Sequence, residues 1–489
     1  MGEGAGDEVK IKQMKPPLSK TKIVATIGPA SSSKDILKRM IDEGVDVFRI
    51  NFSHSPKEEF LKLSSLIKKL NIELDTHVSI LADLQGPKLR IGEIENNHLD
   101  LLPGEIITFI STPCTGNKAH IYMSYQEFPH NVKTGEMILI DDGKIELEVI
   151  ETNKKDTVKA KVIHGGPLSS HKGVNLPNTR VSLPCLTDED ISNAIYAIKQ
   201  EVDWIALSFV RKAADVLELK KLIKENKGYA GVVSKIEKPE ALKEIDQIID
   251  FSDGIMVARG DLGVEMPFDE VPLIQKQIID KCLVQSKPVI VATQMMESMM
   301  INFTPTRAEA TDVTNAVLDG ADALMLSGET SIGKYPVETV FSMQKIIFYT
   351  EAYGKHFDKK HLPVEGTPGF LADSICCNAS RLAKQVKAKA IITFTHSGYT
   401  AFRIASHRPE SDIFAFTNNK KLLGYLSLVW GVKVFYLKTY EQLEIAIQES
   451  IKILKEKNLL ATGDCVIHVG SLPINEHGKT NILKVSLVS

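Results

Sequence analysis

The sequence lacks the features that would place the protein outside the cell or in a membrane. Its 489 residues include only 6 cysteines, and no two of them have C-x-x-C spacing, which argues against a disulfide framework or a structural zinc site. The first residues, MGEGAGDEVKIKQMKPPLSK, have no apolar segment of a secretory signal, and Gly6 stands where a myristoylation signal requires Ser or Thr. No apolar run is long enough to span a bilayer. We therefore expect a cytoplasmic protein in a reducing environment.

The sequence also lacks a strong excess of charge of either sign. Its formal net charge is -3, which gives no reason to expect nucleic acid or an acidic membrane surface as a partner. A phosphorylated substrate would therefore have to be bound by local cations. With 43% hydrophobic and 25% charged residues, the composition is that of an ordinary globular protein, and the length predicts about three domains.

Short apolar segments recur along the chain and alternate with stretches typical of helices. The eight strand-like segments are KIVATIG, DVFRIN, VSILADL, DWIALSFV, GVVSKIE, DGIMVAR, PVIVATQ and ADALMLSGE. Helix-like stretches such as SKDILKRMIDEG and TRAEATDVTNAVLDG lie between most of them, and Gly320 fits a helix end. This alternation predicts a parallel sheet covered by helices, and eight strands predict a (β/α)8 TIM barrel.

Two further regions interrupt or follow the barrel pattern. About 125 residues separate the third and fourth strands, too many for one helical crossover, and they contain strand-like segments such as EMILIDDGKIELEVIE. After the linker KKHLPVEGTPG, strands and helices alternate again and predict an open α/β domain. We divide the chain into an N-terminal segment (1–18), a catalytic barrel (19–87 and 185–355), an inserted small β-barrel domain (88–184) and a C-terminal α/β regulatory domain (356–489). The insertion leaves the barrel at a strand's carboxyl end and could act as a lid over an active site.

Polar residues gather at the predicted carboxyl ends of the barrel strands, where barrel enzymes carry their active sites. They are Arg49, Asn51, Ser53, Asp83, Ser208, Lys235, Glu237, Arg259, Gly260, Asp261, Thr293, Gln294, Ser327 and Glu329. One polar strand end is usually a cap or a turn. Cations and carboxylates from five separate strands predict a functional site.

Three motifs at this rim point to phosphoryl chemistry. In SKIEKPEAL, Lys235 and Glu237 are two residues apart on an extended segment, so their side chains face the same side, and the lysine could neutralise a transferring phosphoryl group. The alternative for this pair is a salt bridge that closes the barrel rim. Asp261 in ARGDLGVE supplies a second carboxylate, which could hold magnesium together with Glu237. The Arg49 guanidinium in RINFSHS suits a phosphate, and the hydroxyl of Thr293 could position a water or a proton.

Taken in order, several long motifs resemble pyruvate kinase over nearly the whole chain from Thr21. They are TKIVATIGPAS, VFRINFSH, ADLQGPKLR, KGVNLP, LSFVR, SKIEKPEAL, GIMVARGDLGVE, ATQMMESM, PTRAEATDVTNAVLDGADALMLSGET and GKYPVE. The resemblance implies magnesium-dependent transfer of the phosphoryl group of phosphoenolpyruvate to ADP, which gives pyruvate and ATP in the last step of glycolysis. Manganese could replace magnesium. The resemblance also implies a homotetramer, with Arg307 at a subunit interface.

The same resemblance implies roles for single residues. Glu237 and Asp261 would hold the metal, and Lys235 would stabilise the phosphoryl group in flight and the enolate left behind. Thr293 would help to deliver the proton that converts enolpyruvate to pyruvate. Arg49 would contact the phosphate, and Arg90 would serve the substrate phosphate or lid closure. The remaining assignments are a carboxylate cradle at Arg259, Gly260 and Asp261, and a nucleotide site at Asn51, His54 and Lys172.

One departure from the family pattern concerns the monovalent cation. Many family members bind potassium through the positions of Asn51, Ser53, Asp83 and Leu84. Here Leu84 replaces the usual threonine, Gln85 follows it, and Lys88 stands where a glutamate is usual. A lysine ammonium has the charge of potassium and three donors, so Lys88 could replace the ion's electrostatic role. We therefore predict activity without potassium; the simpler interpretation is that Lys88 and Arg90 belong to a solvated basic turn.

The second departure lies in the C-terminal domain. The loop THSGYTA matches the family's phosphate-binding loop at a helix start through Thr395, His396, Ser397, Gly398 and Thr400. However, His396 stands where a fructose-bisphosphate-responsive enzyme carries lysine, and the later loop GSLPINEHGKT departs from the usual pattern. The sequence leaves open which sugar-phosphate effector, if any, binds there.

Two other functions remain open at this point. The first is another lyase or mutase on a phosphoenolpyruvate-type barrel, which the insertion at the barrel mouth and the Lys235–Glu237 pair oppose. The second is a catalytically dead, metabolite-sensing scaffold. The presence of Lys235, Glu237 and Asp261 opposes this alternative, because a dead barrel would be expected to have lost its lysine or a metal carboxylate.

Overall fold

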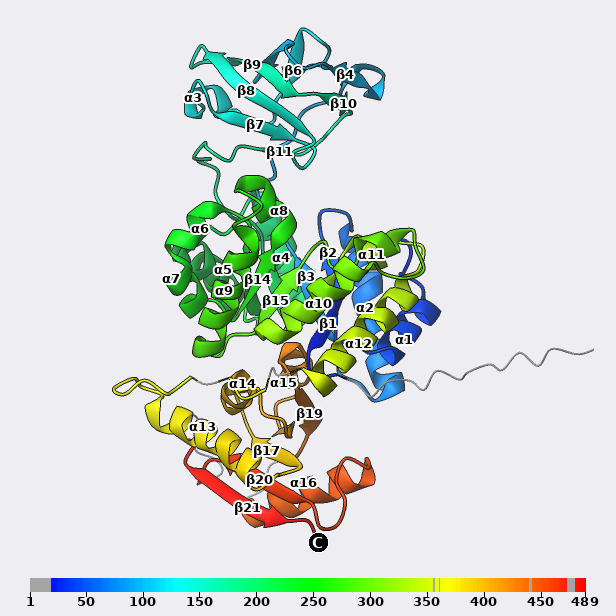
Figure 1. Ribbon diagram of the computed structural model, residues 1–489, viewed down its shortest axis with the longest axis vertical. Helices are drawn as coiled ribbons and strands as arrows, with labels where there is room; N and C mark the ends of the chain where they lie inside the picture. Colours follow the sequence, from blue (N-terminus) through cyan, green and yellow to red (C-terminus); the bar gives the residue numbers. More distant parts are fainter. Residues whose placement is uncertain (1–18, 355–356, 360, 439–441, 473–479) are drawn as a thin grey trace, which may run out of the picture.

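Three structural units follow one another along the longest axis of the molecule (Figure 1). The inserted β-domain lies at one end, the barrel in the middle and the C-terminal domain at the other end. The computed structural model describes residues 19–354, 357–359, 361–438, 442–472 and 480–489. The predicted N-terminal segment (1–18) and residues 473–479 of the loop GSLPINEHGKT lie outside the described residues.

Eight strands close into a barrel in the order β1-β16-β15-β14-β13-β12-β3-β2, which confirms the predicted (β/α)8 fold. The strands are β1 (Lys22–Thr26), β2 (Val47–Asn51), β3 (Ser79–Asp83), β12 (Trp204–Leu207), β13 (Gly231–Ile236), β14 (Gly254–Ala258), β15 (Val289–Ala292) and β16 (Ala323–Leu326). One apolar cluster, with Trp204 and Met256, fills the barrel. A larger one, with Phe48 and Ile279, packs the strands against the helices. Strands buried on both faces explain why their sequences are continuously apolar.

Helices surround the barrel, and their caps explain where several of them begin and end. Helix α10 begins after a capping box formed by Thr306 and Glu309 and ends at Gly320, whose φ of 105° confirms the predicted helix end. The barrel helices are α1 (Lys34–Asp42), α2 (Lys57–Leu74), α4 (Asp188–Lys199), α5 (Ala213–Glu225), α6 (Pro239–Lys243), α7 (Ile245–Phe251), α8 (Arg259–Glu265), α9 (Val271–Gln285), the 3-10 turn η2 (Glu297–Met300), α10 (Arg307–Asp319), α11 (Gly328–Ser331) and α12 (Pro336–Tyr353).

The inserted domain is built from two sheets between β3 and α4. Its main sheet has the order β11-β7-β8-β9-β5-β6, and β10 pairs separately with β4, so the predicted small β-barrel is a half-barrel. Its own apolar core includes Phe109, Leu147 and Val158. The elements are η1 (Glu95–Asn97), β4 (Leu99–Leu101), β5 (Ile106–Ile110), β6 (His120–Tyr122), α3 (Phe128–Asn131), β7 (Met137–Ile140), β8 (Ile145–Thr152), β9 (Thr157–His164), β10 (Gly166–Leu168) and β11 (Val174–Asn175).

Two chain segments connect the inserted domain to the barrel. Gly86 in the first segment has φ of 71°, and a Cβ atom there would lie 2.7 Å from the ring of Phe209, so only glycine fits. At the second segment, the Arg211 guanidinium donates to the carbonyls of Val181 and Leu183, each at 2.5 Å. Both attachments are therefore fixed to the carboxyl-terminal rim of the barrel.

The C-terminal domain is a five-stranded sheet in the order β19-β18-β17-β20-β21, in which β21 runs antiparallel to β20. Its elements are α13 (Phe370–Gln385), β17 (Ala390–Phe394), α14 (Tyr399–Ser406), β18 (Asp412–Thr417), α15 (Lys421–Tyr425), η3 (Leu426–Leu428), β19 (Val432–Tyr436), α16 (Leu443–Glu456), β20 (Cys465–Gly470) and β21 (Ile482–Leu487). Tyr425 stacks on Trp204 at 4.2 Å, and Arg408 pairs with Asp322 at 2.8 Å. These contacts close the amino-terminal mouth of the barrel, so the opposite mouth faces the inserted domain.

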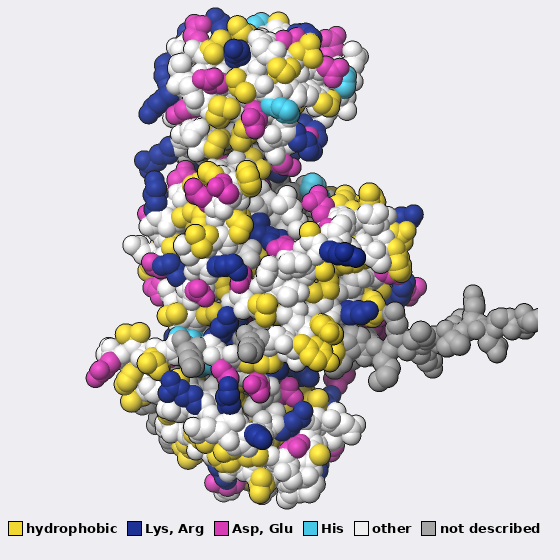
Figure 2. All heavy atoms as spheres, viewed as in Figure 1, with side chains coloured by type: hydrophobic (Ala, Val, Ile, Leu, Met, Phe, Trp, Pro, Cys, Tyr) yellow, Lys and Arg dark blue, Asp and Glu magenta, His cyan; other side chains and the backbone are white. Residues whose placement is uncertain are grey.

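The surface agrees with the small net charge of the chain. Figure 2 shows acidic, basic and apolar side chains interspersed over the visible face of all three units. Among the described helices, none combines the length and the apolar character that crossing a membrane requires. The division of the chain at residues 87, 184 and 355 stays a prediction.

Candidate active site

A buried cluster of charges lies at the carboxyl ends of β2, β3 and β13. Lys235 Nζ lies 2.9 Å from Glu237 Oε1 and 3.5 Å from Asp83 Oδ1. Arg49 Nη2 lies 2.6 Å from Asp83 Oδ2, and Arg49 Nη1 donates to the Thr26 hydroxyl at 3.0 Å. The side chains of Asp83 and Glu237 are each only 1% exposed. Two cations and two carboxylates thus face one another in the barrel mouth, with Lys235 and Glu237 on the same side.

The charges in this cluster determine one another's protonation. Burial opposes the ionisation of Asp83, but Lys235 and Arg49 outweigh it and hold the pKa of this carboxyl below its usual value. Burial also opposes the charge on Lys235, yet Asp83 and Glu237 raise its pKa well above normal. Burial, with help from Asp261 and against Lys235, raises the pKa of Glu237. Lys235 therefore stays a cation, and repulsion between Glu237 and Asp261 favours a cation between them.

Ser208 has a connecting role that the sequence did not reveal. Lys235 Nζ donates to Ser208 Oγ at 2.8 Å, and this hydroxyl donates to the carbonyl of Leu84 at 2.7 Å. The next residue, Phe209, donates its N–H to Glu237 Oε2 at 2.7 Å and has φ of 55°. Sequence reasoning named Ser208 only as a polar strand end and missed Phe209. No signal in the sequence marks either contact, because their partners come from other strands.

Thr293 holds the start of α8 in place. Its hydroxyl accepts from the N–H of Gly260 at 2.7 Å and donates to the carbonyl of Ala292 at 2.6 Å. Thr293 and Gln294 have φ of 66° and 54°, in the left-handed region that most residues avoid. Backbone strain of this kind is typical of functional sites. The predicted proton-delivering residue therefore contacts the backbone of the predicted carboxylate cradle.

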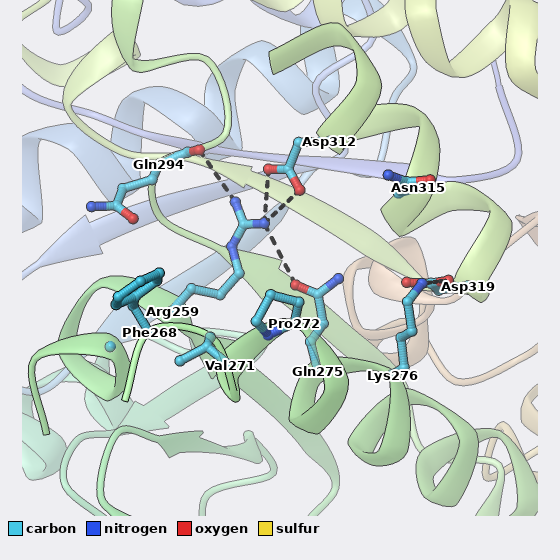
Figure 3. Close-up of a pocket in the computed structure, with 11 residues that line it drawn as sticks. Arg259, Phe268, Val271, Pro272, Gln275, Lys276, Gln294, Asp312, Asn315 and Asp319 are labelled. Carbon is cyan, nitrogen blue, oxygen red and sulfur yellow. Dashed lines mark hydrogen bonds and ion pairs between the residues drawn. The ribbon is translucent and has the colours of Figure 1, made fainter. Parts of the chain in front are cut away.

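The side chain of Arg259 lines a cavity of about 320 Å³ among α8, α9 and α10 (Figure 3). Its Nη1 lies 2.7 Å from Asp312 and 3.5 Å from Gln275 Oε1. Its Nη2 donates to the carbonyls of Thr293 and Gln294 at 2.7 Å and 3.2 Å. The guanidinium thus anchors the start of α8, and only the backbone at Arg259 remains for the predicted carboxylate cradle.

The residues predicted to bind potassium form one group, and Lys88, predicted to replace it, lies apart from them. The group, at the ends of β2 and β3, comprises Asn51, Ser53, Asp83 and Leu84. In it, Asn51 Oδ1 accepts from the N–H of Ser53 at 3.0 Å. Lys88, in the first segment that connects the barrel to the inserted domain, is exposed, and a Cβ atom at Gly173 would lie 3.2 Å from its Cε. Its ammonium makes no hydrogen bond or ion pair with any residue that the structure describes. Lys88 therefore does not pair with Asp83 in this conformation.

Arg90 and His54 flank this connecting segment. Arg90 Nη1 donates to the carbonyl of His171 within the inserted domain at 3.0 Å. Loss of solvation lowers the pKa of His54, and the charges of Arg49, Lys88 and Arg90 lower it further. The residues predicted for phosphate and nucleotide contacts thus share one electropositive environment.

The other predicted nucleotide contact, Lys172, belongs to the inserted domain. Its ammonium lies 2.9 Å from Asp141 Oδ1 in the turn between β7 and β8. Lys144 lies 3.1 Å from the other oxygen of the same carboxylate. The two lysines and burial act on Asp141 in opposite directions, and the lysines prevail, so the pKa of Asp141 is lowered. Lys172 is held at the face of the inserted domain that carries this turn.

The predicted effector loop lies at the start of α14. It comprises Thr395, His396, Ser397, Gly398 and Thr400. Gly398, with φ of 87°, donates its N–H to the hydroxyl of Thr395 at 2.9 Å. The hydroxyls of Thr400 and Thr480 lie 2.9 Å apart. The loop is held by its own Thr395 hydroxyl and by the contact with Thr480, and its role stays a prediction.

The carboxylates of Glu237 and Asp261 fit a divalent metal. Within the described ranges, no three His, Cys, Asp or Glu side chains gather to hold a metal by themselves. Magnesium in proteins usually takes one or two carboxylates and completes its shell with water and substrate phosphates. Glu237, whose pKa is raised by burial with help from the nearby Asp261, forms together with Asp261 a donor set of this kind.

Comparisons with known proteins agree with this geometry. Residues 18–340 match the family described as "Pyruvate kinase, barrel domain", and residues 373–486 match "Pyruvate kinase, alpha/beta domain". The chain belongs to the pyruvate kinase family. Pyruvate kinases are phosphotransferases of glycolysis, so the predicted enzyme class is confirmed. The roles of the single residues stay predictions.

Individual pyruvate kinases match almost the full length of the chain. The enzyme of Sporosarcina psychrophila is 41% identical over 473 residues, which cover 96% of this chain and 81% of that protein. The enzyme of Geobacillus stearothermophilus is 40% identical over 479 residues, with coverage of 96% and 80%. A crystal structure of a pyruvate kinase from Cryptosporidium parvum has a TM-score of 0.89 at 34% identity and covers 97% of this chain and 98% of that one.

Proposed function

We propose that the protein transfers the phosphoryl group of phosphoenolpyruvate to ADP and releases pyruvate and ATP. The buried cluster of Arg49, Asp83, Lys235 and Glu237 carries this proposal. A lysine that carboxylates keep protonated inside a barrel mouth can neutralise the charge of a phosphoryl group in transfer. The cation costs no reorganisation during the reaction, because Ser208 already fixes it at 2.8 Å.

The proposed roles follow the positions of the side chains. The bond between phosphorus and the enol oxygen breaks while phosphorus bonds to an oxygen of the ADP β-phosphate, and Arg49 and Lys235 contact the transferring oxygens. Glu237 and Asp261 would hold Mg²⁺, or Mn²⁺ in its place, which supplies positive charge to the substrate's phosphate and carboxylate. The backbone of Arg259, Gly260 and Asp261 lines the position of the carboxylate. The enolate then takes a proton on its terminal carbon, and Thr293 positions the donor.

We further propose that this activity does not require potassium. Asp83 already has two protein cations, with Arg49 at 2.6 Å and Lys235 at 3.5 Å. Lys88 lies two residues beyond Gly86, is exposed and has no partner in the described part of the chain, so its ammonium is available to this rim. Such a lysine would supply there the charge that potassium supplies elsewhere.

An assay of phosphoenolpyruvate and ADP coupled to pyruvate detection tests both proposals. Turnover should stay within about two-fold when a tetraalkylammonium salt replaces potassium at equal ionic strength. Lys88→Glu, which restores the residue usual in the family, should create a potassium requirement, and Lys155→Glu at an exposed position of the lid should not. Absence of any turnover would refute the proposed reaction. A large fall on potassium removal in the unmodified protein would refute only the potassium proposal.

We also propose a homotetramer, an effector site and a cytoplasmic location. Arg307 is exposed at the start of α10, near exposed Ile301 and Phe303, and such apolar exposure suits a subunit contact. Light scattering after size exclusion measures the assembly. Titration of sugar phosphates at low phosphoenolpyruvate tests the loop that ends at Thr400. All six cysteines are free, which supports a reducing compartment.

A further inference from the structure

Three polar side chains meet at the junction between the inserted domain and the barrel. Asn175 lies in β11 of the inserted domain, Lys238 immediately precedes α6, and Glu265 ends α8. Glu265 Oε1 accepts from Lys238 Nζ at 2.5 Å and from Asn175 Nδ2 at 2.7 Å. The side chain of Glu265 is 2% exposed. Neither the sequence motifs nor the proposed reaction gives these residues a role.

The folding of the separate units does not explain this contact. Asn175 and Glu265 are 90 residues apart, and they belong to units with separate apolar cores. A carboxylate loses much solvation when it is buried and is tolerated only with partners. Glu265 finds one partner in the barrel and one in the lid, so its burial is complete only with the lid in this position. The contact therefore fixes how the two units sit relative to each other.

All three side chains belong to segments that carry the proposed site. Lys238 directly follows Glu237, and α8, which ends at Glu265, also contains Asp261. Asn175 lies three residues after Lys172. A movement of any of these segments would change the separation between the lid lysine and the metal-binding carboxylates.

The turn between β7 and β8 also approaches α8. A Cβ atom added at Gly143 in this turn would lie 4.0 Å from Val264 Cγ1 on α8. The same turn contains Asp141, which holds Lys172 at 2.9 Å. The inserted domain therefore hydrogen-bonds to α8 at Glu265 and passes near it at Val264, and both places lie close in sequence to Lys172 or its partner.

We propose that Asn175, Lys238 and Glu265 form a lid latch, a set of positioning residues that fixes Lys172 relative to Glu237 and Asp261. The latch sets the affinity for the nucleoside diphosphate, because that substrate needs the lid and the barrel together, whereas phosphoenolpyruvate needs the barrel rim. This inference rests on the proposed function.

The variant Asn175→Asp tests the latch with almost no change in side-chain volume. It places a second carboxylate where the Asn175 amide lies 2.7 Å from Glu265, and like charges at this distance repel strongly in a buried site. We expect the KM for ADP to rise about ten-fold, which corresponds in free energy to the loss of about one charge-assisted hydrogen bond. The KM for phosphoenolpyruvate should stay within about two-fold of its value in the unmodified protein. Asn117→Asp is the matched control, since the exposed side chain of Asn117 accepts through Oδ1 from the N–H groups of Ala119 and His120, which an aspartate also does.

A compensating substitution separates positioning from simple damage. Adding Glu265→Gln to Asn175→Asp returns one carboxylate and one amide to the junction, with Lys238 still beside them, and should bring the KM for ADP to within about three-fold of the unmodified protein. An unchanged KM for ADP in Asn175→Asp, an equal rise in the KM of both substrates, or no recovery in the double variant would overturn the latch. The turnover of the unmodified protein, measured in the same series, tests the proposed reaction separately.

Discussion

Removal of the Lys235 ammonium should inactivate the protein and destabilise it in a pH-dependent way. Lys235→Met keeps a side chain of similar length but removes the cation that lies 2.9 Å from Glu237 and 3.5 Å from Asp83. The Ser208 hydroxyl also loses its donor. Asp83 then keeps only Arg49 as a cationic partner, and Glu237 loses its ion-pair partner.

The expected magnitudes follow from these contacts. Loss of one partner of a buried ion pair costs about 3–5 kcal/mol, and we expect the lower end because Arg49 still pairs with Asp83. Removal of one preorganised group that stabilises the transition state lowers kcat by about 10²–10³-fold. Because Lys235→Met removes a full charge, we expect kcat to fall by at least the upper of these factors.

The pH dependence of this destabilisation has a definite sign. Lys235 lowers the pKa of Asp83 and opposes the rise in the pKa of Glu237, so both carboxyl groups titrate higher in the variant. A carboxyl whose folded pKa is raised stabilises the fold fully below its unfolded value, near 4.5 for Glu237, and loses that contribution as the pH rises through the folded pKa. Asp83, whose lowered pKa keeps it ionised in the unmodified protein below its usual 3.8, already contributes to the stability difference between Lys235→Met and the unmodified protein in acid. This difference should therefore keep growing as the pH rises past 4.5 and be largest near neutrality.

Three measurements check this prediction. Urea unfolding at several pH values gives the stability difference, the coupled assay gives kcat, and a thermal shift with phosphoenolpyruvate shows whether the substrate still binds. Lys243→Met, at an exposed lysine of α6, is the control and should behave as the unmodified protein. A folded Lys235→Met variant with kcat within about ten-fold of the unmodified protein would refute the assigned role.

Two further predictions concern the C-terminal domain. His468 in β20 is 1% exposed, neither ring nitrogen has a partner in the described residues, and burial lowers its pKa from 6.5 to about 4. Neutral His468 is therefore compatible with the fold above pH 6.5, and the free energy of unfolding should fall by about 3 kcal/mol as the pH falls to 4. In urea titrations at both pH values, His468→Leu should remove this loss. Equal acid sensitivity of the variant would contradict the prediction. Arg408→Met should cost about 3–5 kcal/mol in thermal unfolding, because buried Asp322 loses the guanidinium 2.8 Å away; a change below about 1 kcal/mol would contradict it.

Much of the fold could be predicted because local chemistry determines it. Eight continuously apolar segments matched eight strands buried on both faces, and Gly320 ended its helix through a positive φ that glycine adopts without strain. The shared orientation of the Lys235 and Glu237 side chains could also be predicted, since residues two apart in an extended segment face the same side.

The rest of the site depends on contacts between segments that are distant in the chain. Ser208 joins Lys235 to the carbonyl of Leu84 only because β12 lies between β3 and β13 in the closed barrel. The turn of the Arg259 guanidinium toward Asp312 depends on how α8 packs beside α10.

Sequence spacing therefore determined which side chains lie on the same face of a strand and at which end of the barrel they are placed. Closure of the barrel and the packing of the inserted domain against α8 decided which of them meet. Side-chain direction follows from the local backbone, whereas a distance across 90 residues, as between Asn175 and Glu265, follows from the packing of the whole molecule.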